Sequence, residues 1–186
     1  MAAILQHDLT DYARPPAVVG VGDPLRADEA VGLHILGELR EFMRSWLGRV
    51  EFVDATLPGH APSELLRGRA AMVLVGSLAR GGAPGSVHVL SGRDAVRMRR
   101  GHPNAAPAGN TVSLLRTLRV VDALPRTVTV IGVEPGRLER GMGLSDAVRE
   151  ALPAAGRQAR VAVEAMSEAE EARRGAADLG PRAIAG

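Results

Sequence analysis

The sequence predicts an α/β fold with a mainly parallel sheet, because apolar runs of strand length alternate with helical patterns along the chain. The chain has 186 residues, of which 46% are hydrophobic and 24% are charged, so it can build one globular domain with a sizeable core. We expect that domain over residues 17–172, after a flexible arm at 1–16 and before a frayed tail at 173–186.

The first half of this domain is expected to contain three strands and two helices. An apolar run at 17–22 reads as a buried strand and leads through a glycine-rich turn into a helix with Asp28 as its N-cap. The apolar residues of that helix recur at helical spacing between Ile35 and Leu47. The next elements are a strand at 50–54, a short helix at 63–67 and a fully buried strand at 70–75.

The second half begins with a weakly alternating segment at 86–90, which is expected to be an edge strand. Residues 91–109, rich in Arg, Gly, Pro and Ala, are predicted to be a long loop. A segment at 144–172 is predicted to be helical, with Pro153 kinking or dividing it. Between the loop and this segment lie a helix at 111–121 and a strand at 127–133. Ligands of such sheets bind beyond the carboxyl ends of the strands, so we expect the functional residues there.

Composition excludes several classes of function. The chain has no cysteine, which excludes disulfides, thiol catalysis and cysteine-ligated metal sites, and no lysine, which excludes Schiff-base chemistry. No apolar run reaches the ~18 residues of a membrane span and the first sixteen residues lack a secretory pattern, so a cytoplasmic location is expected. The net charge is +2 and aromatic residues are scarce, which argues against a nucleic-acid partner.

The turn after the first strand reads G-V-G-D-P-L-R-A-D-E-A-V-G from Gly20 to Gly32. A dinucleotide site fits it poorly, because Leu25 stands at the third glycine and Asp23 places a carboxylate where a pyrophosphate would approach. Asp23, Asp28 and Glu29 gather at the strand-to-helix junction instead. Two interpretations stay open: these acids hold a cation, or Asp28 caps the helix while Glu29 complements the helix dipole.

This turn resembles the opening motif of the hydrogenase maturation proteases, which trim the C-terminal extension from the large subunit of nickel–iron hydrogenases. The family pattern is G-x-G-N-x-L-x-x-D-[DE]-x-[IV]-G, and the chain departs from it at Asp23. Residues 127–153 also resemble the last strand, the following turn and the start of the final helix of the family. The resemblance covers residues 17–165 and implies a three-layer α/β sandwich with a twisted, mostly parallel sheet of about five strands flanked by helices.

The resemblance implies a site for nickel recognition with three ligands, of which this chain keeps one. The retained acid is Glu29. Gly76 replaces the aspartate that follows the third strand, and Asn110 replaces the histidine that opens the helix after the long loop. Glycine offers no ligand atom, and an amide oxygen suits nickel less well than an imidazole does. His60, His102 and Asn110 are the candidate substitute ligands.

The activity that the resemblance implies is an endopeptidase that recognises a nickel-loaded hydrogenase large subunit and removes its C-terminal extension. Nickel is then carried by the substrate, and no organic cofactor is expected. The candidate catalytic residues are Asp23, Asp28 and Asp54, because paired acids that activate water are the remaining route when no nucleophile arrangement is evident. The alternative is a non-catalytic relative that binds a hydrogenase subunit or a maturation factor without cleavage, and a third hypothesis is a small-ligand binder.

Overall fold

A five-stranded sheet forms the middle layer of the protein, in a computed structural model that describes residues 14–56, 61–98 and 111–178. The strand order is β2-β1-β3-β5-β4, in which only β4 runs antiparallel to its neighbour β5. The strands are β1 (Ala17–Gly20), β2 (Glu51–Asp54), β3 (Ala71–Ser77), β4 (Val87–Ser91) and β5 (Thr127–Val133). The mostly parallel sheet and its edge strand at β4 agree with the sequence prediction.

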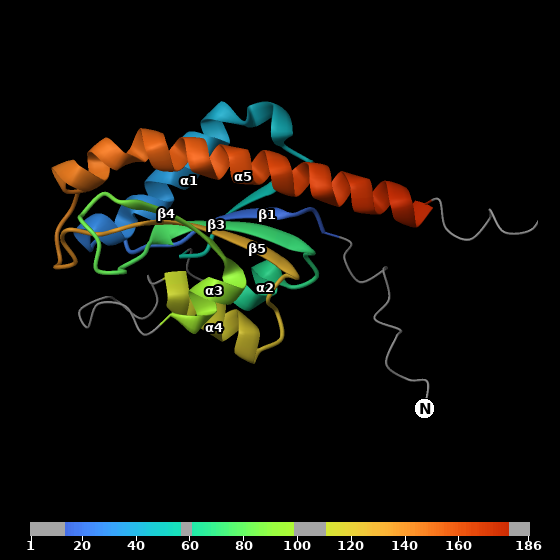
Figure 1. Cartoon of the computed structure of the whole chain (residues 1–186), viewed down its shortest axis with the longest axis horizontal. Helices are drawn as coiled ribbons and strands as arrows, with labels where there is room; N and C mark the ends of the chain where they lie inside the picture. The colour runs from blue at the N-terminus through green and yellow to red at the C-terminus, as the bar shows by residue number, and fades with distance from the viewer. Residues whose placement is uncertain (1–13, 57–60, 99–110, 179–186) are drawn as a thin grey trace, which may run out of the picture.

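Helices cover both faces of the sheet, which gives the predicted three layers (Figure 1). One face carries α1 (Val31–Phe42) and α5 (Asp146–Asp178), and the other carries α2 (Pro62–Leu66), α3 (Gly92–Arg97) and α4 (Thr111–Val120). Two 3-10 helices, η2 (Ala27–Ala30) and η3 (Arg44–Trp46), flank α1. None of the described helices is long and apolar enough to cross a membrane.

The central strand β3 is buried along its whole length because helices cover it on both faces, and its sequence AMVLVGS is accordingly almost continuously apolar. The glycines of the first turn let α1 approach the sheet closely. A Cβ on Gly32 would lie 2.3 Å from the carbonyl oxygen of Val21 and 2.5 Å from that of Val75. The glycines are therefore required by helix-to-sheet packing, and this packing places η2 at the carboxyl edge of the sheet.

Two expectations about local structure are wrong, and one of two alternatives for the final helix is excluded. Asp28 does not cap α1: it lies inside η2, and its side chain bonds to a distant loop instead. The described part of the predicted loop at 91–109 contains α3, whose N-cap Ser91 accepts a hydrogen bond from the backbone N–H of Asp94. Residues 99–109 of that loop lie outside the described residues. Of the two alternatives for Pro153, division of the final helix is excluded, since α5 runs unbroken from Asp146 to Asp178. A kink at Pro153 stays a prediction.

Described residues on both sides of the predicted domain boundaries contact or continue the domain. Residues 173–178, expected to be part of a frayed tail, belong to α5. At the other end, the carbonyl oxygen of Pro15 accepts a 2.6 Å hydrogen bond from Arg69, whose side chain is buried. Residues 14–16 are therefore attached to the domain, while 1–13 and 179–186 lie outside the described residues.

Candidate functional site

The acids singled out in the sequence lie on the segments that leave the carboxyl edge of the sheet. Asp54 is the last residue of β2 and stands beside Gly20 in the register of β1. Asp23 follows β1, and Asp28 and Glu29 belong to η2. The parallel strands thus bring the four carboxylates to one edge, as their order along the chain predicted.

Asp28 is fully buried, and both of its carboxylate oxygens accept hydrogen bonds. Its Oδ2 accepts from the backbone N–H of Gly136 at 2.8 Å, that of Arg137 at 2.7 Å and the hydroxyl of Ser145 at 2.8 Å. Its Oδ1 accepts from the backbone N–H of Ser145 at 2.6 Å. Four donors converge on one carboxylate, so Asp28 holds the segment between β5 and α5 against η2.

Glu29 is also fully buried, and the chain itself supplies a cation beside it. Arg26 Nε lies 3.4 Å from Glu29 Oε2, and the same guanidinium donates a 2.8 Å hydrogen bond to the carbonyl oxygen of Leu138. The ion pair compensates the charge of a carboxylate that is removed from water. The retained acid of the family motif is therefore paired with a guanidinium.

The space beside Gly76 is already filled. A Cβ at this position would lie 2.4 Å from Thr111 Oγ1 and 2.7 Å from Val21 Cγ1. Thr111 is buried at the first position of α4, and its hydroxyl donates a 2.7 Å hydrogen bond to the carbonyl oxygen of Ser77. An aspartate at residue 76 would require these neighbours to move.

The two remaining candidate acids belong to local turns and are partly buried. Asp54 Oδ1 accepts hydrogen bonds from the backbone N–H of Thr56 at 2.8 Å and from its hydroxyl at 2.6 Å. Asp23 Oδ1 accepts from the backbone N–H of Leu25 at 2.9 Å. Both are turns in which the side chain bonds to the backbone two residues on. Of the two, Asp54 is the one at a strand end.

No three His, Asp or Glu side chains within the described parts of the chain are grouped so that they could hold a metal ion. The substitute ligands His60, His102 and Asn110 lie outside the described residues, so their role stays a prediction.

One buried acid at this edge was missed by the sequence reasoning. Glu134 directly follows β5, and its carboxylate accepts hydrogen bonds from the backbone N–H groups of Arg80 (2.9 and 3.0 Å) and Gly81 (2.9 Å). His88 Nε2 lies 3.1 Å from Glu134 Oε2. Burial alone would raise the pKa of Glu134, but the hydrogen bonds from Arg80, Gly81, His88 and Gly82 outweigh it and lower the pKa. The sequence signal that could have identified Glu134 is its position directly after a buried strand, at the edge where ligands bind.

A cleft of about 610 Å³ opens beside these groups. Arg26 and Glu134 line it together with Gly136, which Asp28 holds in place, and Glu139 adds a second carboxylate. Arg26 thus lies both at the cleft and beside buried Glu29. The cleft offers a guanidinium, carboxylates and backbone groups, which suits recognition of a polypeptide segment.

Comparison with known proteins gives one family and one fold. A family model described as hydrogenase maturation protease (HycI) matches residues 34–160, which begin after the glycine-rich turn. No curated protein sequence matches the chain.

Three solved structures show the same fold at low identity. The hydrogenase maturating endopeptidase HybD from E. coli has a TM-score of 0.66 at 23% identity, over 81% of this chain and 93% of that one. The hydrogenase 2 maturation peptidase from Thaumarchaeota archaeon SCGC_AB-539-E09 has a TM-score of 0.58 at 23% identity, over 81% and 99%. The [NiFe] hydrogenase maturation protease HybD from Thermococcus kodakarensis has a TM-score of 0.59 at 18% identity, over 82% and 99%.

Proposed function

Because this chain belongs to the hydrogenase maturation protease family, we propose that it recognises the large-subunit precursor of a nickel–iron hydrogenase at the carboxyl edge of its sheet. The cleft lined by Arg26 and Glu134 lies at that edge and is the surface that we assign to the precursor. In this proposal any nickel is part of the precursor, no organic cofactor takes part, and the encounter takes place in the cytoplasm.

The family activity would be removal of the C-terminal extension of the precursor. Of the three candidate catalytic acids, Asp54 suits this role best, because it is partly exposed and, unlike Asp23, which is also partly exposed, is the last residue of a strand at this edge. Asp28 suits it least, since its oxygens already accept four hydrogen bonds. Asp23 lies in a turn and bonds to the backbone of Leu25.

Binding without cleavage is the second candidate, and one observation favours it: the space in which the second family ligand would stand is occupied by Thr111. Residue 76 can neither donate a ligand atom nor accommodate one without displacing its neighbours. The ion pair between Arg26 and Glu29 supports the same interpretation, because a metal would have to compete with the guanidinium for this carboxylate. We therefore infer that the chain engages the precursor without a nickel-dependent cleavage step.

The test uses two forms of a hydrogenase large-subunit precursor, one loaded with nickel and one without. We expect both forms to comigrate with the chain in size-exclusion chromatography, and the mass of each precursor to stay unchanged. Loss of the extension from the nickel-loaded form alone would overturn this inference and support the endopeptidase, in which case Asp54→Asn should abolish the loss. If the precursor neither forms a complex with the chain nor loses its extension, both candidates are excluded.

A further inference from the structure

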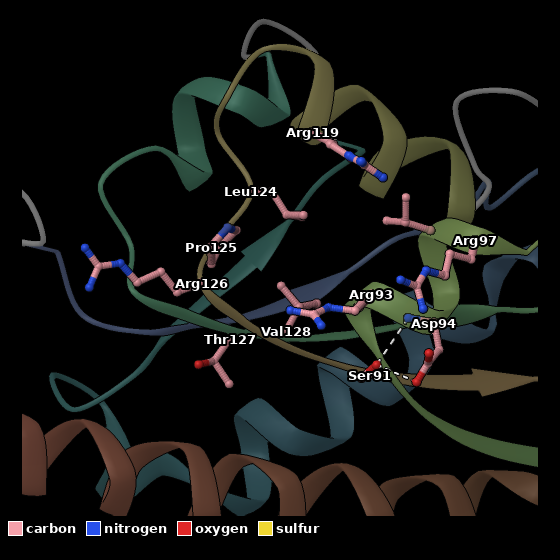
Figure 2. Close-up of a pocket in the computed structure, with 12 residues that line it drawn as sticks. Ser91, Arg93, Asp94, Arg97, Arg119, Leu124, Pro125, Arg126, Thr127 and Val128 are labelled. Carbon is pink, nitrogen blue, oxygen red and sulfur yellow. Dashed lines mark hydrogen bonds between the residues drawn. The ribbon is translucent and has the colours of Figure 1, made fainter. Parts of the chain in front are cut away.

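A second cavity, of about 690 Å³, lies at the other end of β5 from the cleft. It is formed where β4 ends and β5 begins, between α3 and α4 (Figure 2). The amino end of β5 contributes Thr127 and Val128 to its lining, whereas Glu134 of the cleft lies just beyond the carboxyl end of the strand. The two sites are separated by the length of the strand, so binding at this cavity does not depend on the proposed function.

Three arginines surround one side of this cavity. Arg93 and Arg97 are four residues apart on α3 and therefore share a side of that helix, and Arg119 comes from α4. Figure 2 shows these three on one side, whereas Arg126 points away from them. All three are exposed, and their side chains form no ion pair with an acid anywhere in the described ranges.

The one acid in the lining, Asp94, can compensate only one of the three positive charges. Asp94 Oδ2 accepts a 2.6 Å hydrogen bond from the hydroxyl of Ser91, which in turn accepts from the backbone N–H of Asp94. This reciprocal pair caps the start of α3. The carboxylate stabilises the helix cap and keeps its negative charge, so one acid stands against three arginines. The cavity therefore has a surplus of positive charge, because guanidinium groups stay protonated in proteins.

The helices that carry the arginines are fixed to the sheet and to each other. A Cβ on Gly92 would lie 2.5 Å from Val128 Cβ, so the first turn of α3 rests directly on β5. Arg116 of α4 donates a hydrogen bond to the carbonyl oxygen of Met98, at the end of α3. Both helices are also anchored in the core through Ala95 and Leu118, which are fully buried. The arginines therefore project from a rigid base.

The floor of the cavity adds an apolar surface. Leu124, Pro125 and Val128 lie between Arg126 and the other arginines (Figure 2). The volume is within the ~300–1,000 Å³ that is usual for small-molecule sites. A ligand of that size could place a charged part on the arginines and an uncharged part on the floor.

We infer that this cavity binds a small ligand that carries two or three linked phosphate groups. Guanidinium groups match phosphate oxygens in geometry and bind them through paired N–H donors. Linked phosphates carry several negative charges, which together can match the three guanidinium groups. A ligand with one carboxylate group would match only one of these guanidiniums. Binding also removes the repulsion between Arg93 and Arg97, which share a helix side. An inorganic diphosphate and a nucleoside diphosphate both have this chemistry.

The test is calorimetric titration of the full chain with pyrophosphate and with ADP, at physiological ionic strength so that weak surface attraction is screened. We expect saturable binding with one site per chain. Equal affinities would identify the inorganic ligand, and an affinity for ADP that is at least about tenfold higher would identify a nucleotide whose base rests on the apolar floor. No saturable binding of either probe would overturn the inference.

Variants localise the binding. Arg97→Gln and Arg119→Gln should each weaken binding by about tenfold or more, because each removes hydrogen bonds to a charged ligand. The matched control is Arg157→Gln, which makes the same change of charge at an exposed position of α5, on the opposite face of the sheet. Thermal melting should be unchanged in all three. An equal loss in the control, or binding of a hexa-aspartate peptide in place of both phosphates, would refute the site.

Discussion

Replacing Asp28 with asparagine tests whether this residue is a buried structural acceptor or a catalytic acid. Asparagine has almost the same shape, but its amide group donates where the carboxylate accepts. If the amide oxygen takes the place of Oδ2, the hydrogen bonds from Gly136, Arg137 and the Ser145 hydroxyl are kept. The amide NH2 then faces the backbone N–H of Ser145, whose 2.6 Å bond is lost.

The expected cost is about 2–4 kcal/mol of unfolding free energy. A hydrogen bond to a charged acceptor contributes about 1.5–3 kcal/mol, and the opposed donors and the weaker neutral bonds add to the loss. For a domain of this size each kcal/mol lowers the melting temperature by about 2–4 °C. Asp28→Asn should therefore melt about 4–16 °C below the wild type.

The assay combines thermal melting with amide hydrogen exchange. Exchange should accelerate at residues 136, 137 and 145, because their N–H groups are those that Asp28 binds. Asp23→Asn is the control: its oxygen still accepts from Leu25 in a partly exposed turn, so the cost should stay within about 0.5 kcal/mol. A variant Asp28→Asn that melts like the wild type but loses a cleavage activity would refute the structural role and restore Asp28 as a catalytic residue.

Three further predictions concern the same edge of the sheet. Gly76→Ala should cost about 1–3 kcal/mol in urea unfolding, and less in a Thr111→Ala background, because the added Cβ lies 2.4 Å from Thr111 Oγ1. Arg26→Met should lower the free energy of unfolding by about 3 kcal/mol, since it leaves Glu29 buried without this partner. The double variant with Glu29→Met should recover most of that loss. If it recovers none, the ion pair is not what stabilises the buried carboxylate. Glu134→Gln should be less stable than the wild type at pH 7. Because folding lowers the pKa of Glu134, the stabilisation by its carboxylate is present above the ordinary carboxyl pKa of about 4.3 and is lost as the pH falls through the pKa of the folded state. Urea unfolding should therefore show that the difference in unfolding free energy between wild type and Glu134→Gln shrinks at acidic pH. A difference that is constant with pH would contradict this assignment.

Most of the fold was predictable because each strand carries its own signal. The strand predicted at 127–133 coincides with β5, and the one predicted at 70–75 lies one residue from β3 at its start and two at its end. Both are continuous apolar runs, which parallel strands covered on both faces require. The helix α3 was missed because GRDAVR is short and polar, and its stability comes from the Ser91 cap and from packing of Ala95, neither of which is visible as a periodic pattern.

The site was predictable in its location but not in its contacts. The order of strands and turns placed Asp23, Asp28, Glu29 and Asp54 at one edge. The donors that occupy Asp28 come from more than 100 residues away in the chain, so only the folded structure pairs them. The contact between residues 76 and 111 is of the same kind. Arg26 was the exception: three residues before Glu29, it could have been recognised as a partner from spacing alone.

The pairing of Arg26 with Glu29, together with the side chain packed beside Gly76, bears on any attempt to engineer a nickel centre into this scaffold. An aspartate at residue 76 alone would overlap with its neighbours, and removal of the Arg26 guanidinium alone would leave the Glu29 carboxylate buried without this partner. Each change made singly lowers stability before a coordination sphere exists to compensate it. A successful graft has to make both changes at once and hollow out the space at Thr111, which makes the design concerted rather than stepwise.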